Sequence, residues 1–283
     1  MGVSTAAAGI AATDAALATY SKLDPLREQE ILNSHTANLL TSPPASVRAV
    51  LARIPSDEER ARQARWKAGL KTRKEAAGEL QAAYRAFNRL SSGNLGGDST
   101  DAFGKAASAV AAFAKARDLP IAESPVPGIV GNALGELVRV QQGRDIRRHN
   151  AILAELSRQF LELWKADQPA FEQVIEGAYN MRLAPAIVSL PDNAFDASAV
   201  SKQIPEPLSA DLKLRLYRMR LLSNSSAETE AAKRQLGAVG KAIGALQDAH
   251  VELAKDSPTV SDVIDYLDRA IELSREAEGG EAE

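Results

Sequence analysis

The chain has 283 residues, of which 45% are hydrophobic, 25% charged and 5% aromatic, and it contains no cysteine. This composition excludes a disordered chain, and the missing cysteines exclude disulfides, thiol catalysis and thiolate metal sites. A formal net charge of −3 gives no overall attraction for phosphate backbones, so we expect no nucleic-acid partner.

Residues 1–20 lack the basic start and the strong apolar centre of a secretion signal, and no run reaches the ~18 apolar residues of a membrane-spanning helix. The Met1-Gly2 start before small residues has two interpretations. It is either a native cytosolic start or the point at which a targeting segment with a lipidated cysteine was removed. We therefore expect membrane contact only through such a removed anchor.

Alanine-rich helical segments begin at the N-terminus. The first predicted helix spans residues 5–40 and contains Pro25, where a kink is expected because proline removes a backbone hydrogen bond. A short helix is predicted at 46–54. Ser56 and Glu59 then have the spacing of a capping box, which predicts that a long helix begins there.

This helix is predicted to end near residue 90, and its stripe of Leu80, Tyr84 and Phe87 has the spacing of a buried face. A glycine- and serine-rich loop follows at 91–97. The next helix begins at residue 99 or 100 and ends before Pro120. Its predicted core face consists of Phe103, Ala107, Val110 and Ala114.

From residue 128 another helix is predicted, with two apolar stripes separated by the polar interval 141–150. The second stripe has heptad-like spacing. We expect a separate, shorter helix after Pro169 and a proline-rich crossover at 184–207. The second stripe is formed by Ile146, His149, Leu153, Leu156, Phe160 and Leu163.

Residues 211–222 alternate apolar and basic side chains as a strand does, but no second such run exists for pairing. Leu212, Leu216, Met219 and Leu222 fit a helical stripe, so a helix is predicted. The basic residues at 213, 215, 218 and 220 spread around that helix and are expected to lay their stems on the bundle. Ser225 and Glu228 predict a new helix to about residue 256, and a last helix is predicted at 260–276.

The predicted fold is all-α: an elongated antiparallel bundle of about seven or eight helices, several longer than 30 residues. We expect one domain over 1–278 and an acidic tail at 279–283. Glycines spaced four apart at 131 and 135, and at 240 and 244, predict that their two helices approach closely.

Residues that carry chemistry are scarce. Ile146 and Gln247 stand three residues before His149 and His250, so the Glu-x-x-His pairs of a di-iron bundle are absent, and phosphate-loop and nucleophile-elbow motifs are absent too. The sequence therefore predicts no catalytic residue, no metal, no cofactor and no enzymatic activity.

One polar cluster, in the interval 141–150, is a candidate binding site. Its members Arg144, Arg147, Arg148 and His149 lie within about one helical turn and could receive an anionic group. The alternative, which we favour, is a solvated helix face or a turn at Gly143, with Asp145 paired to the histidine.

These observations favour a non-enzymatic binding or structural module with a protein partner, in the envelope of a bacterium and extracytoplasmic rather than cytoplasmic. Two alternatives stay open. One is a membrane-active helical protein, pore-forming or secretion-associated, with a hairpin from 102–116 and 127–140. The other is a small-ligand-binding bundle with a pocket lined by Trp164, Phe160 and Tyr179.

Overall fold

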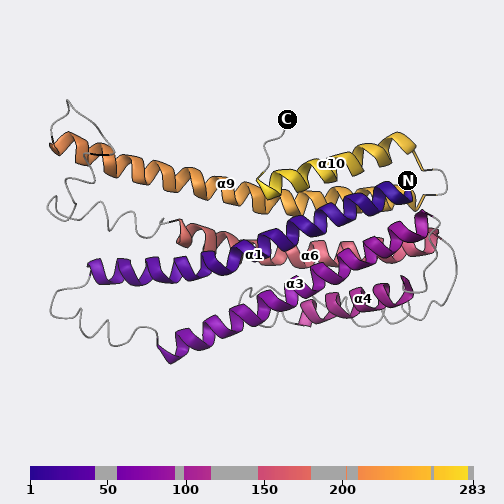
Figure 1. The fold of residues 1–283 in the computed structure, drawn as a ribbon, viewed down its shortest axis with the longest axis horizontal. Coiled ribbons are helices and arrows are strands. Elements are labelled where there is room, and N and C mark those ends of the chain that lie inside the picture. Colours follow the sequence, from indigo (N-terminus) through magenta and orange to yellow (C-terminus); the bar gives the residue numbers. More distant parts are fainter. Residues whose placement is uncertain are drawn as a thin grey trace. The chain divides into compact units, whose positions relative to one another are not determined.

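Every element of the chain that the structure describes is an α-helix, which confirms the all-α bundle. The structure is a computed structural model, and it describes residues 1–41, 56–92, 99–115, 146–179, 202, 210–255 and 258–279. The helices are α1 (Gly2–Thr41), α3 (Asp57–Ser91), α4 (Ser99–Lys115), α6 (Ile146–Ala178), α9 (Ala210–Leu253) and α10 (Val260–Glu278) (Figure 1). Four of them exceed 30 residues, as predicted.

The chain divides into two compact units. The first unit consists of Met1–Lys22, Ala61–Ala170 and Arg234–Glu283, and the second of Leu23–Arg60 and Phe171–Lys233. Helices α1, α3, α6 and α9 each contribute one part to the first unit and the other part to the second. The prediction of one domain stays a prediction, and the tail from residue 280 lies outside the described residues.

The local rules of helix formation explain where α3 begins. The Ser56 Oγ accepts a hydrogen bond from the Glu59 N–H at 3.2 Å, and the Glu59 carboxylate accepts one from the Ser56 N–H at 2.7 Å. These two bonds are the predicted capping box. Acidic residues at 57, 58 and 59 add a favourable interaction with the helix dipole.

Two helices continue through residues at which the sequence suggested an end. Pro169 lies inside α6, and Ser225 lies inside α9, so the predictions of a separate helix after Pro169 and of a new helix at Ser225 are wrong. Pro169 is exposed, as is Lys165, whose carbonyl loses its helical partner, so water can replace that bond. At Ser225 the preceding turns are already helical, and the backbone N–H groups that a cap would bind have intrahelical partners.

In the first unit, α3 runs opposite to α1 and to α6, and α9 runs opposite to α6, whereas α4 runs parallel to α6. Gln81 of α3 donates a hydrogen bond to Asp14 of α1, while Ser91 of α3 lies beside Gly2 of α1. Residue numbers therefore rise along α1 where they fall along α3. Pairs of the same kind are Arg73 with Asp167 and Tyr84 with Ser157 between α3 and α6, and His250 with Asn150 and Gly240 with Trp164 between α9 and α6.

The α1 face in the first unit is made of small side chains, so its neighbour approaches closely. A Cβ atom on Gly9 would lie 2.2 Å from Cδ1 of Tyr84, a distance that real Cβ atoms essentially never show. Gly9 is therefore required by close approach to α3. The buried residues around it are Ala6, Ala8, Ala12, Ala15 and Ala16.

A helical hairpin closes the described part of the chain. Helix α10 folds back beside the C-terminal part of α9 (Figure 1), and it ends at Gly279, whose φ of 93° is the left-handed conformation of a C-cap. The Gly279 position also lies beside the Gln235 side chain. Among the described helices, none combines the length and the hydropathy required to span a membrane.

Candidate functional site

The predicted anion-binding cluster lies at the edge of the described residues. Arg144 is outside them, and Arg147 and Arg148 lie in the first turn of α6 with side chains that are also outside. His149 is partly buried, and its ring centroid lies 5.1 Å from that of Phe103. The structure thus positions one of the four residues, and the cluster stays a prediction.

The interior of the first unit instead brings polar side chains together in two places that the sequence analysis did not identify. One is a charged pair between α3 and α6, formed by Arg73 and Asp167. The other is a neutral hydrogen-bonded network between α3, α6 and α9, formed by Tyr84, Ser157, Asn150 and His250.

Arg73 and Asp167 form a bidentate ion pair that is buried from solvent. The Arg73 Nε donates to Asp167 Oδ2 at 2.6 Å and the Nη2 donates to Oδ1 at 2.9 Å. The guanidinium carbon lies 5.1 Å from the centroid of the Phe113 ring of α4. The planar fork therefore joins α3 to α6 while its face contacts α4, which specifies how these three helices pack.

This pair has chemical consequences for the aromatic residue beside it. Burial raises the pKa of the Tyr20 hydroxyl well above its ordinary value, and the Asp167 carboxylate raises it further, while Arg73 acts in the opposite direction. Tyr20 is therefore a neutral phenol at physiological pH. Within the described part of the chain, the Arg73 Nη1 has no hydrogen-bond partner.

The neutral network is a directed chain of hydrogen bonds. The His250 Nδ1 lies 2.7 Å from the Asn150 Oδ1, an amide oxygen that only accepts, so the proton is on Nδ1. The Nε2 then accepts from the Tyr84 hydroxyl at 2.7 Å, and Tyr84 in turn accepts from the Ser157 hydroxyl at 2.6 Å. All four side chains are buried.

Burial also keeps this network uncharged. It lowers the pKa of His250 to about 3, and it raises the pKa of Tyr84, against the smaller effect of the Ser157 hydrogen bond. The phenol separates Ser157 from the imidazole, so the histidine does not receive the serine proton as a general base would. The geometry thus fits a network that holds three helices in register.

The signal that could have revealed these residues is their position within apolar stripes. Arg73 occupies the stripe position between Leu70 and Ala77, and His250 follows Leu246 by four residues on the buried face of α9. A charged or polar residue in such a position predicts a buried partner. Its partner depends on helix packing, which sequence spacing does not give.

Residues proposed for a ligand pocket are packed against other aromatic rings. The Trp164 ring lies 5.1 Å from Tyr20, and the Phe160 ring lies 5.8 Å from Phe113, centroid to centroid. Tyr179 belongs to the second unit and is only partly buried. Within the described ranges, no group of three or more histidine, aspartate or glutamate side chains is placed to hold a metal ion.

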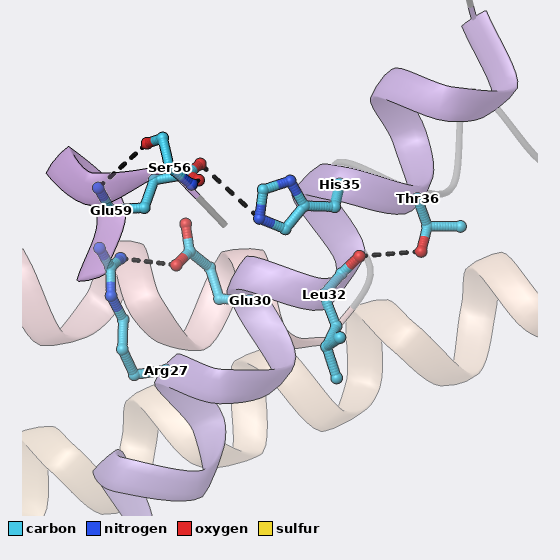
Figure 2. Close-up of polar contacts among 7 residues, drawn as sticks. All are labelled: Arg27, Glu30, Leu32, His35, Thr36, Ser56 and Glu59. Atoms are coloured by element: carbon cyan, nitrogen blue, oxygen red, sulfur yellow. Dashed lines mark hydrogen bonds and ion pairs between the residues drawn. The ribbon is translucent and has the colours of Figure 1, made fainter. Parts of the chain in front are cut away.

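The second unit contains its own polar contacts. Figure 2 shows Glu59 of the capping box with the His35 ring beside it, the Nε2 lying 3.6 Å from the carboxylate, and the Arg27–Glu30 ion pair of α1. The Asn33 amide donates to the carbonyls of residues 177 and 178, at 2.9 and 2.8 Å. It thus satisfies carbonyls at the C-terminal end of α6, where the helix itself offers no donors.

An exposed apolar stripe lies on the α9 part of the second unit. Leu212, Leu216 and Met219 are 43%, 36% and 64% exposed. The predicted helix is confirmed, but its stripe faces outward, because Lys213 and Leu214 occupy the buried side. Of the basic residues predicted to lay their stems on the bundle, Lys213 lies against the protein, whereas Arg215 is exposed. Three large apolar side chains at i, i+4 and i+7 are the pattern of a helix face that contacts a partner.

Gly131 and Gly135, for which close helix packing was predicted, lie outside the described residues. Gly240 does lie close to a neighbouring helix: a Cβ atom on Gly240 would be 3.3 Å from the Trp164 ring.

Comparison with models of protein families, with curated proteins and with solved structures gave no match to this chain.

Proposed function

We propose that the chain is a non-enzymatic binding or structural module that acts through its surface on a protein partner. The exposed stripe of Leu212, Leu216 and Met219 carries this proposal. Large apolar side chains gathered on one exposed helix face mark interaction sites more often than isolated ones do.

The interior supports the same proposal. The side chains best suited to acid-base or electrostatic chemistry are Arg73, Asp167, Tyr84 and His250, and all are buried and hydrogen-bonded, Arg73 to Asp167 and Tyr84 to His250. Groups held in this way stabilise helix packing and do not face a substrate in this conformation. We propose that the protein acts by binding a partner and not by catalysing a reaction.

The stripe also defines the chemistry of the partner. Residues 210–223 contain four basic residues and one acidic residue, giving a net charge of +3, and Arg215 is exposed beside the stripe. An apolar face with basic neighbours fits an acidic, apolar surface on the partner. As part of the proposal we place the protein in the envelope of a bacterium, which its alanine-rich, cysteine-free composition supports and which cell fractionation tests.

The experiment compares wild type with a Leu216→Glu, Met219→Glu variant as affinity baits in extracts of the cells that encode the protein. A protein retained only by wild type is then purified, and its dissociation constant for both baits is measured. We expect the stripe variant to bind at least ~10-fold more weakly, because a buried charge replaces an apolar contact. Leu32→Glu, at a leucine 59% exposed on α1, is the control. Equal binding by all three chains overturns the proposal.

A further inference from the structure

The exposed surface of α10 complements the α9 stripe. Val260 and Ile264, which are 50% and 48% exposed, are followed at the same spacing of four residues by the exposed Asp268 and Glu272. Residues separated by four form a ridge on a helix surface. We call Val260, Ile264, Asp268 and Glu272 the acidic ridge, and Leu212, Arg215, Leu216 and Met219 the basic stripe.

The two surfaces match in chemistry. Each consists of neighbouring exposed apolar side chains next to charge, and the charges have opposite sign. Helix α10 contains six acidic and two basic residues, giving −4, against +3 for residues 210–223, of which Lys213 lies on the buried side and Arg215 is exposed beside the stripe. The buried side of α10, which includes Val263, Leu267 and Ala270, contacts its own unit, so the ridge is available to a partner.

We propose that the partner of the basic stripe is the acidic ridge of a second copy of this chain. This inference rests on the proposed function, in which the stripe is a binding surface. Two stripes would bring like charges together, and so would two ridges, whereas a stripe on a ridge pairs opposite charges and covers apolar side chains on both. The contact is therefore heterologous, and each bound copy presents a further stripe and a further ridge.

Single helices meeting along a few turns bury less than a standard interface, so the self-association is weak, with a dissociation constant of roughly 10–1,000 µM. Sedimentation velocity of the full chain over this concentration range measures it. We expect the weight-average mass to rise with concentration, and to rise less at ~0.5 M salt than at ~0.05 M, because salt screens exposed charges. A wild-type chain that stays monomeric throughout overturns the inference.

Two surface variants test which faces meet. Leu216→Glu places an acidic group in the basic stripe, and Ile264→Lys places a basic group in the acidic ridge, so each variant alone should lose association at least ~10-fold. An equimolar mixture of the two variants should recover association. In the mixture the intact stripe of one variant can bind the intact ridge of the other, and the altered stripe can bind the altered ridge, so each contact joins opposite charges. Leu32→Glu should associate as wild type does. Circular dichroism confirms that each variant is folded.

The remaining outcomes distinguish this inference from the proposed function. If the mixture fails to recover association, the stripe and the ridge do not contact each other, and the inference is wrong. If wild type binds vesicles of anionic lipid through the stripe without self-association, the partner is a membrane and both proposals fall. If wild type is monomeric but the stripe variant loses a purified protein partner, this inference falls and the proposed function stands.

Discussion

Replacing Gly9 with alanine should destabilise the first unit, although alanine is the better helix former. The new Cβ would lie 2.2, 2.4 and 2.5 Å from three carbons of the Tyr84 ring. Hydrogen bonds to Ser157 and His250 hold that ring, so it cannot simply turn away. Overpacking of a core costs ~1–3 kcal/mol, and a clash this deep belongs at the upper end.

The gain in helix propensity opposes this cost. Glycine to alanine in a helix interior is worth ~1 kcal/mol, so the net loss of unfolding free energy at Gly9 should be ~2 kcal/mol. Gly78 of α3 is the matched control, since a Cβ there would meet nothing within 4 Å. Gly78→Ala should stabilise by up to ~1 kcal/mol, and the two variants should therefore differ by ~3 kcal/mol.

Urea unfolding followed by tryptophan fluorescence measures this difference. Trp66 and Trp164 are the two tryptophans of the chain, and both are buried in the first unit, so the fluorescence reports on that unit. On a Tyr84→Phe background the ring loses its hydrogen bonds and can move, so the cost of Gly9→Ala should shrink. If Gly9→Ala stabilises as much as Gly78→Ala does, the close approach of α1 to α3 is not present in solution and the reasoning fails.

Three further variants test the polar contacts. Asp167→Asn leaves the Arg73 guanidinium buried without its counter-charge, and the free energy of unfolding should fall by ~3–5 kcal/mol; an unchanged midpoint in urea would mean that water reaches the pair. His250 has a folded pKa of about 3, below its ordinary 6.5, so the unfolded chain takes up the proton first as the pH falls. The stability due to neutral His250 is therefore complete above pH ~6.5 and is lost toward pH ~3, with a slope approaching ~1.4 kcal/mol per pH unit. Denaturation between pH 7 and 4 should show a shallower slope in His250→Gln, and identical slopes would contradict the burial of this ring. Ser56→Ala removes one bond of the capping box and should lower the free energy of unfolding by ~1 kcal/mol. Unfolding followed by circular dichroism measures this loss, and an unchanged free energy would mean that tertiary packing alone sets the start of α3.

Local patterns predicted the helices well wherever the cause of structure is local. The capping box at Ser56 depends on residues three apart, and it forms as predicted. The same pattern at Ser225 forms no cap, and Pro169 ends no helix, because a long helix that buries residues on both sides of such a position retains more packing than it loses in one hydrogen bond. Helix breaks were thus the least predictable feature.

The buried polar pairs could not be predicted in full from spacing. Arg73 and Asp167 are 94 residues apart, and Tyr84 and His250 are 166 apart, so each pairing depends on which helices become neighbours. Periodicity does identify the stripes in which these residues lie, but it does not show which stripe is covered by a neighbouring helix. The spacing of Leu212, Leu216 and Met219 therefore predicted a helix in this part of α9, but not that this face of the helix is exposed.

The order in which the two units occur along the chain has a consequence for synthesis on the ribosome. The first unit needs residues from both ends of the chain, and Tyr84 and Asn150 must wait for His250 before their network is complete. An emerging chain can pair α1 with α3 and α3 with α6 early, but Asn150 of α6 lacks its partner until α9 has left the exit tunnel. We expect a ribosome-stalled chain ending before residue 250 to be readily cleaved by protease within the first unit.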